Sequence, residues 1–338
     1  MRQVQGASDL HKRFRGELKH APEALTNDGY ELAGLVATLQ LINRFHPADR
    51  INVAYLTPIP KTAESVGRTI SKGIDDVVHV NGKEASFDDV IGCVVDGEIE
   101  AGVISDEKVS TVVITYPEEL STKTRNALLS VISTGSYTLS IGGQNRTIRS
   151  SATFATISPP KGNEFDPSFT ALDQTDVDPE ILREMDLLVV DSPEHDSPET
   201  SRGQPHPTSS SILQDMFNTS EAQSKPDIPN GIKYGLLTAI ESHDSAGRFT
   251  DWPSERHHGL FTREELAQTM SNVAIGFARC MGDTTVSDSH EVATRELMSL
   301  LMDRVEYTLP DDFYRGAQGT SEETSVPIAD VSSPDPSR

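Results

Sequence analysis

The sequence predicts an α/β fold with a mostly parallel sheet, followed by a small all-helical module. Two patterns support this prediction. Short apolar strands alternate with amphipathic helices over residues 28–192, as in sheets with helices on both faces. Over residues 232–308 the apolar residues recur at helical spacing alone, which predicts a helical module. A chain of 338 residues is long enough for this arrangement.

The core begins with a predicted helix over residues 28–45, where apolar side chains recur every three or four positions. The remaining core elements are short buried strands, one amphipathic helix and one hairpin whose turn contains Gly142 and Gly143. The strands are expected at 51–56, 109–115, 153–157 and 187–190, the helix at 121–133 and the hairpin at 137–148.

Segments outside the core differ from it in composition. Residues 1–27 form an amino-terminal arm before the first helix. Residues 193–231 are rich in Pro, Ser, Thr, Glu and Gln, which predicts a flexible linker. The helical module contains predicted helices at 232–241, 264–282 and 290–306, and residues 309–338 read as a disordered acidic tail.

The chain is strongly acidic, with 52 Asp and Glu against 29 Lys and Arg and a net charge of -23. The acidic residues are dispersed, a distribution that indicates a halophilic protein, because molar salt shortens the Debye length to ~3 Å. Such a charge excludes indiscriminate polyanion binding but permits local basic contacts. Apolar runs are too short for a membrane span, and two cysteines provide no disulfide framework, so we expect a cytoplasmic protein. No His or Cys spacing predicts a metal site.

Several strings of residues together suggest a family. Glu100-Ala-Gly102 precedes a strand, and Val112–Leu128 then continues without a gap through that strand and the following helix. The other strings are Phe165-Asp-Pro167, Ile181–Leu188 and Phe277–Met281. This set resembles the motor domain of the MCM (minichromosome maintenance) replicative helicases, which are AAA+ ATPases. The resemblance implies an AAA+ core with a P-loop-like site over 28–192 and a helical lid over 232–308.

The resemblance fails where ATP would bind. The family's phosphate loop reads G-D-P-G-T-A-K-S, and this chain has Pro58-Ile-Pro in place of its first residues, followed by Lys61, Thr62, Ala63, Glu64 and Ser65. Glu64 therefore stands at the position of the phosphate-binding lysine. A carboxylate ~4 Å from a phosphate charge costs about 4 kcal/mol at an effective dielectric of 20. Pro58 also lacks the N–H that the loop would donate.

The other nucleotide positions of the family depart in the same way. Thr115 and Tyr116 replace the two Walker B acids, which hold magnesium and position the attacking water. Ser158 replaces the sensor asparagine. Glu184 stands at the arginine finger and Glu264 at the lid's sensor arginine, preceded by Arg183 and Arg263. We therefore expect no catalytic residue and no bound cofactor.

These departures predict an accessory or regulatory protein of DNA replication that has lost ATP turnover. Its expected partners are an MCM helicase, another replication protein, a second copy of the chain, or DNA contacted through Arg146 and Arg149 of the hairpin. The alternative for these arginines is that they are solvated strand residues. The alternative function is an atypical ATP- and Mg-dependent helicase that uses Lys61, Arg183, Arg263 and either Glu118 or Glu119 in displaced roles. Otherwise the two glutamates are charges at a helix N-terminus.

Overall fold

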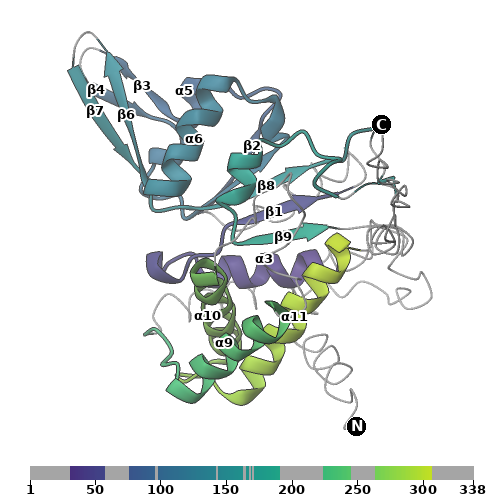
Figure 1. The fold of residues 1–338 in the computed structure, drawn as a ribbon. Helices are drawn as coiled ribbons and strands as arrows, with labels where there is room; N and C mark the ends of the chain where they lie inside the picture. Colours follow the sequence, from purple (N-terminus) through teal and green to yellow (C-terminus); the bar gives the residue numbers. More distant parts are fainter. Residues whose placement is uncertain are drawn as a thin grey trace, which may run out of the picture.

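A five-stranded parallel sheet forms the centre of the computed structural model (Figure 1). Its strands are β1 (Val53–Leu56), β2 (Val77–Asn81), β5 (Thr111–Thr115), β8 (Thr153–Ser158) and β9 (Leu187–Val190), in the spatial order β2-β5-β8-β1-β9. All neighbouring pairs run parallel, which confirms the predicted α/β class. The structure describes residues 31–57, 76–95, 98–141, 144–162, 165–166, 169, 171–190, 224–244 and 263–306.

The strands of the sheet centre are apolar because both of their faces are covered. In β5, Val113 belongs to one hydrophobic cluster while Val112 and Ile114 belong to another on the opposite face. This continuous burial explains why the sequence pattern identified β1, β5, β8 and β9. Strand β2 was not predicted, because His79 interrupts its apolar residues and Asn81 ends it. His79 Nε2 lies 3.1 Å from Thr115 Oγ1 on the neighbouring strand.

Helices cover both faces of the sheet, as predicted. Helix α3 (Glu31–Asn43) lies on one face and α6 (Thr122–Thr134) on the other (Figure 1). The ends of α6 are set by its sequence. The Ser121 side chain accepts a hydrogen bond from Thr124 N, and Gly135 ends the helix at φ 71°, donating its N–H to Val131 O.

Two hairpins and a short helix extend from one end of the sheet (Figure 1). They are β3 (Gly92–Val95) with β4 (Glu98–Ala101), β6 (Ser136–Ile141) with β7 (Gln144–Arg149), and α5 (Phe87–Val90). The Glu100-Ala-Gly102 string ends the first hairpin. A Cβ on Gly102 would lie 2.5 Å from Gly92 N, so the close approach of two backbone segments requires glycine there.

The carboxyl-terminal helices share a core with the sheet. They are α9 (Asn230–Asp244), α10 (Arg263–Met281) and α11 (Asp288–Glu306), close to the predicted ranges. Buried side chains of all three belong to the same cluster as α3 and one face of the sheet. A Cβ on Gly276 would lie 3.1 Å from Leu39 Cδ2, which shows how closely α10 approaches α3. The sequence pattern predicted a helical module but did not indicate this shared core.

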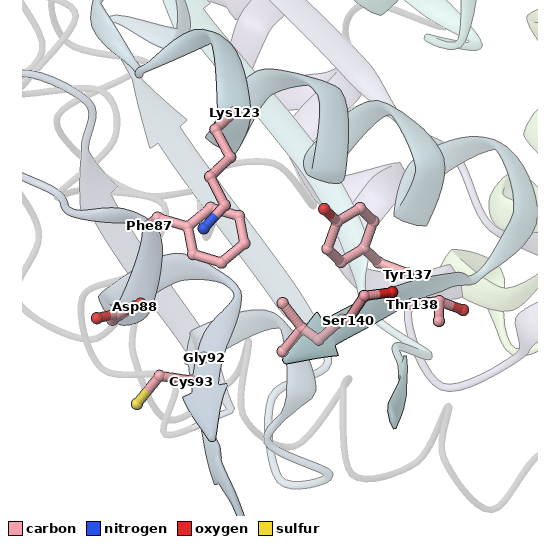
Figure 2. Close-up of a pocket in the computed structure, with 9 residues that line it drawn as sticks. Phe87, Asp88, Gly92, Cys93, Lys123, Tyr137, Thr138 and Ser140 are labelled. Carbon is pink, nitrogen blue, oxygen red and sulfur yellow. The ribbon is translucent and has the colours of Figure 1, made fainter. Parts of the chain in front are cut away.

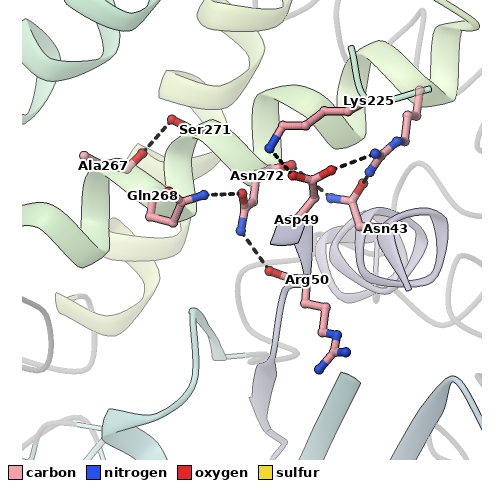
Figure 3. Close-up of polar contacts among 9 residues, drawn as sticks. Asn43, Asp49, Arg50, Lys225, Ala267, Gln268, Ser271 and Asn272 are labelled. Carbon is pink, nitrogen blue, oxygen red and sulfur yellow. Dashed lines mark hydrogen bonds and ion pairs between the residues drawn. The ribbon is translucent and has the colours of Figure 1, made fainter. Parts of the chain in front are cut away.

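A buried polar network fixes α10 against the turn that follows α3 (Figure 3). Arg279 of α10 donates to Asn43 at 2.6 Å and to Asp49 at 2.7 Å. Asp49 ends the short helix η2 (Pro47–Asp49) and also pairs with Lys225 at 2.5 Å. Asn43 in turn donates to Asn272 O at 2.9 Å. The network joins three segments that are distant in the sequence.

Several predicted segments lie wholly or partly outside the described residues. These are the arm at 1–27, the tail at 309–338 and residues 193–223 of the predicted linker. Within the rest of that linker, Ile228 is buried in the shared core and Asp227 forms a bridge with Thr285.

Candidate functional site

Three predicted nucleotide-site residues come together at the carboxyl ends of the central strands. Because β5, β8 and β1 are parallel, their last residues lie side by side at one edge of the sheet. Tyr116 N donates to Ile157 O at 2.9 Å, and Thr57 N donates to Ser158 O at 3.0 Å. Thr115, Tyr116 and Ser158 therefore occupy one edge of the sheet.

Neither residue at the predicted Walker B positions presents a carboxylate at this edge. The Thr115 side chain is buried, and its hydroxyl lies 3.1 Å from His79 Nε2 and 3.4 Å from Val80 O. Tyr116 has φ 55° and ψ 55°, a left-handed conformation that costs an L-residue energy. Its ring is buried, and the Lys83 ammonium lies 3.7 Å from the ring centroid. Packing, and not solvent, surrounds both side chains.

Glu118 is a carboxylate that is hydrogen-bonded to this edge of the sheet. It belongs to the short helix η4 (Pro117–Glu119), and its Oε2 accepts a hydrogen bond from Ser158 Oγ at 2.9 Å. Burial raises the pKa of Glu118, and the neighbouring Glu119 and Asp176 carboxylates raise it further. Glu118 and Glu119 lie in the first turn of η4, and Ser121, which caps α6, follows them.

Two other predicted positions lie at the opposite edge of the sheet. Arg183 and Glu184 end α7 (Pro179–Arg183), directly before β9 begins. Near them, Asp186 accepts a hydrogen bond from Asn52 N at 2.7 Å, before β1 begins. Since the strands are parallel, these residues lie at the amino ends, away from Thr115 and Ser158. Within one chain the structure therefore does not bring the two sets together.

The start of α10 lies at this amino-terminal edge as well. Thr269 Oγ1 lies 3.4 Å from Asp186 Oδ1. Burial raises the pKa of Asp186 to about 6, and the Glu184 and Glu265 carboxylates add to the shift. Arg263 and Glu264 are the first two residues of α10, and their side chains lie outside the description. The same holds for the whole predicted phosphate loop, Lys61, Thr62, Ala63, Glu64 and Ser65, so its nucleotide contacts stay a prediction.

The candidate DNA contacts Arg146 and Arg149 lie on opposite faces of the β6–β7 hairpin. The register pairs Leu139 with Arg146 and Ser136 with Arg149. Side chains alternate between the two faces of a strand, so positions three apart point in opposite directions. Both arginines are exposed. The two arginines therefore extend from opposite faces of the hairpin.

A pocket of about 250 Å³ lies between the two hairpins and α6 (Figure 2). The Lys123 ammonium lies 3.6 Å from the centroid of the Phe87 ring. The Phe87 and Tyr137 rings meet edge to face, with centroids 6.3 Å apart. The pocket was not foreseen, because its lining residues come from separate elements: Phe87, Asp88, Gly92, Cys93, Lys123, Tyr137, Thr138, Leu139 and Ser140.

Two features are absent from the described part of the chain. It contains no group of three or more His, Cys, Asp or Glu side chains placed to hold a metal ion. Across the same residues, no helix combines the length and the apolar character that crossing a membrane requires.

Comparison with known proteins identifies the architecture. No protein-family model matches the sequence, and no curated protein matches it. Among solved structures, the chain is similar to a full-length MCM homolog from Methanopyrus kandleri, with a TM-score of 0.65 and 14% sequence identity. The chain has the fold of an MCM homologue. The match covers 90% of this chain and 63% of that protein, so this chain spans less than two thirds of the MCM homolog's length.

The MCM-like fold confirms the resemblance at the level of architecture. The identity of 14% is too low to transfer an activity. The sequence strings located the strand end that carries Thr115 and Tyr116, and the apolar run at 153–157 located the end that precedes Ser158. They did not reveal the hydrogen bond between Ser158 and Glu118, because no spacing in the sequence links these residues across two strands.

Proposed function

We propose that this chain is an MCM-like accessory protein of DNA replication that acts by association and does not turn over ATP. The observation that carries the proposal is the strand edge where β5 ends. Phosphoryl transfer in this class of fold needs carboxylates that hold magnesium and orient water. Thr115 and Tyr116 supply none, and both side chains are packed inside the protein. Glu64 in place of the phosphate-binding lysine points in the same direction.

A second candidate function rests on Glu118. A half-buried carboxyl group with a raised pKa, oriented by a hydroxyl, has the properties of a general base. In an atypical ATPase, Glu118 would replace the Walker B glutamate, with Lys61, Arg183 and Arg263 in the other roles. Arg183 lies at the opposite edge of the sheet, so this enzyme would require a neighbouring chain to complete its site.

Calorimetry with ATP and magnesium in molar KCl distinguishes the two candidates. We expect neither tight binding nor magnesium-dependent hydrolysis by the wild-type chain, and measurable binding by Glu64→Lys. Hydrolysis that disappears in Glu118→Gln, a variant that keeps the size of the side chain, would establish the ATPase and reject our proposal. Glu119→Gln is the matched control, because Glu119 is exposed and lies next to Glu118.

For partners, we propose an MCM helicase or another replication protein, joined through a side surface, and DNA through the hairpin. The hairpin segment carries Arg146 and Arg149 and no acidic residue between 136 and 149. Each arginine that contacts a phosphate should contribute about 1 to the slope of log affinity against log salt. Titrating Arg146→Gln and Arg149→Gln with duplex and single-stranded DNA tests this contact. A halophilic origin and a cytoplasmic location remain part of the proposal.

A further inference from the structure

Part of the lining of the pocket between the hairpins comes from a segment of unusual composition. Residues 120–163 contain no Asp or Glu, although 52 of the 338 residues of the chain are acidic. The basic residues of this acid-free segment are Lys123, Arg125, Arg146, Arg149 and Lys161. Lys123 and the four residues Tyr137–Ser140 belong to this segment and line one side of the pocket. That side attracts anions in a protein that otherwise repels them.

Lys123 has capacity for an anionic ligand. Its ammonium rests on the Phe87 ring, and no carboxylate among the described residues forms an ion pair with it. An ammonium group has three N–H donors, and the ring face engages it from one side only. The remaining donors are directed away from the ring. A carboxylate can therefore bind Lys123 without displacing it from Phe87.

The rest of the pocket suits one apolar side chain. Figure 2 shows Phe87 and Tyr137 beside the space, with Ser140 at its edge. Leu139 adds an aliphatic surface. The Ser140 hydroxyl donates to Asn145 Oδ1 at 2.7 Å and the Thr138 hydroxyl lies 3.5 Å from Thr147 Oγ1, both on β7, so the side chains that face the space from β6 are those of Tyr137 and Leu139. A volume of about 250 Å³ is below the ~300–1,000 Å³ of typical small-molecule sites, and it accommodates a fragment the size of an amino-acid side chain.

The opposite wall of the pocket is acidic. It contains Asp88 and Cys93, and the Cys93 thiol donates to Glu100 Oε2 across the β3–β4 hairpin at 3.8 Å. Glu98 and Glu100 are both exposed on β4. A nucleic acid carries a charge at every nucleotide and would be repelled along this wall. A peptide can place one carboxylate on Lys123 and present backbone N–H groups to Asp88.

We propose that this pocket binds a segment of a protein partner that places a single carboxylate on Lys123 and an apolar side chain between Phe87, Tyr137 and Leu139. The inference rests on the proposed function, because a protein that acts by association needs such a docking site. It names the chemistry of that partner: one acidic residue next to a phenylalanine or leucine, with few other charges.

Fluorescence anisotropy of the full chain in 0.5 M KCl tests the pocket. The probe is a fluorescein-labelled peptide with one carboxylate side chain, Ser-Gly-Phe-Asp-Leu-Gly, and its matched control is Ser-Gly-Phe-Asn-Leu-Gly. We expect saturable binding of the acidic peptide alone, weakened about tenfold by Lys123→Gln, which is about 1.4 kcal/mol. Lys161→Gln is the control variant, since Lys161 belongs to the same acid-free segment but pairs with Asp176. It should leave affinity within about twofold.

Phe87→Leu removes the aromatic ring but keeps an apolar side chain and Lys123, so it tests the contribution of the ring apart from that of the charge. Melting curves verify that each variant is folded. We expect this variant to weaken the acidic peptide as well. Equal affinity for the two peptides, an unchanged affinity in Lys123→Gln, or no saturable binding would reject the pocket. Displacement of the peptide by a ten-nucleotide oligothymidylate, with Lys123 required for its binding, would assign the pocket to nucleic acid and also reject it. The ATP calorimetry and the peptide titration use different ligands and different variants. ATP hydrolysis would therefore reject the proposed function without changing the result expected for the peptide.

Discussion

Asp49 and Arg279, 230 positions apart in the sequence, form a buried ion pair with 2.7 Å between Asp49 Oδ2 and Arg279 Nη2. Their side chains are 2% and 0% exposed, so water does not screen the contact. The pair fastens α10 to the turn before β1 and so joins the helical segment to the sheet. Because the charges are buried, removing Arg279 leaves Asp49 with only the half-exposed Lys225 ammonium as a charged partner.

We therefore expect Arg279→Met to destabilise the chain by about 3–5 kcal/mol, because Asp49 would lose its buried partner. Urea unfolding followed by circular dichroism measures the change. Arg295→Gln is the matched control. Arg295 forms an exposed pair with Glu291, four positions away on α11, and its loss should cost about 0–1 kcal/mol. Equal losses in the two variants would contradict the role of the buried pair.

Because of Asp186, we expect the free energy of unfolding to decrease as pH rises from about 4 to about 7. Burial raises its pKa from 3.8 to about 6, so the folded chain holds this proton more tightly than the unfolded chain does. The stabilisation is present below pH 3.8 and disappears as pH rises through about 6, a loss of about 3 kcal/mol.

Asp186→Asn tests this sign. Asparagine resembles the protonated acid and still accepts a hydrogen bond from Asn52 N. Its stability relative to the wild-type chain should increase between pH 4 and pH 7 and then remain constant. Unfolding free energies across that range measure the difference, and a constant difference between the two proteins would show that Asp186 titrates normally.

The sequence was sufficient for the sheet centre because burial on both faces leaves continuous apolar strands such as Val112–Ile114. It was insufficient for β2, where His79 breaks the pattern but gains a contact with Thr115 in the folded chain. The long helices were predicted well, since their periodicity is local, whereas the short helices α5 and α7 were not predicted because they are too short to show a period. The shared core of the helical segment was not predicted, because the Asp49–Arg279 pair joins residues whose distance in the sequence carries no local signal.

The candidate site shows the same division. Ungapped strings placed Thr115 and Tyr116 at a strand end, and parallel pairing brings that end next to Ser158. The strings did not predict which side chains pack at this end of the sheet. The half-buried Glu118 carboxyl group and the pocket at Lys123 depend on contacts between separate elements, which only the three-dimensional packing determines.

Because of His290, we expect the free energy of unfolding to decrease as pH falls below 6.5. The ring is buried at the start of α11, where Nδ1 accepts a hydrogen bond from Ser287 N at 3.0 Å. The proton is therefore assigned to Nε2, which lies 3.3 Å from Asp283 Oδ2. Burial lowers the pKa of His290, and the Asp283 carboxylate opposes this shift. The stabilisation is present above pH 6.5 and is lost as pH falls through the lowered pKa.

His290→Asn retains an acceptor for Ser287 N but cannot become charged. We expect the variant to lose less stability than the wild-type chain between pH 6.5 and pH 5, as measured by thermal unfolding in buffers of constant salt. Parallel losses in the two proteins would place the acid sensitivity at other groups.

Tyr116 provides a test of the strained strand end on which the proposed loss of ATP turnover rests. Replacing it with alanine or glycine removes the same buried ring, so the two variants differ only in backbone preference. At φ 55° glycine should be more stable than alanine by about 1 kcal/mol, because a Cβ is unfavourable in the left-handed region. The order should reverse on α6, where Ala127→Gly is expected to cost about 1 kcal/mol. If Tyr116→Gly proves less stable than Tyr116→Ala in urea unfolding, the chain does not hold residue 116 in this conformation, and the packed arrangement at the end of β5 is incorrect.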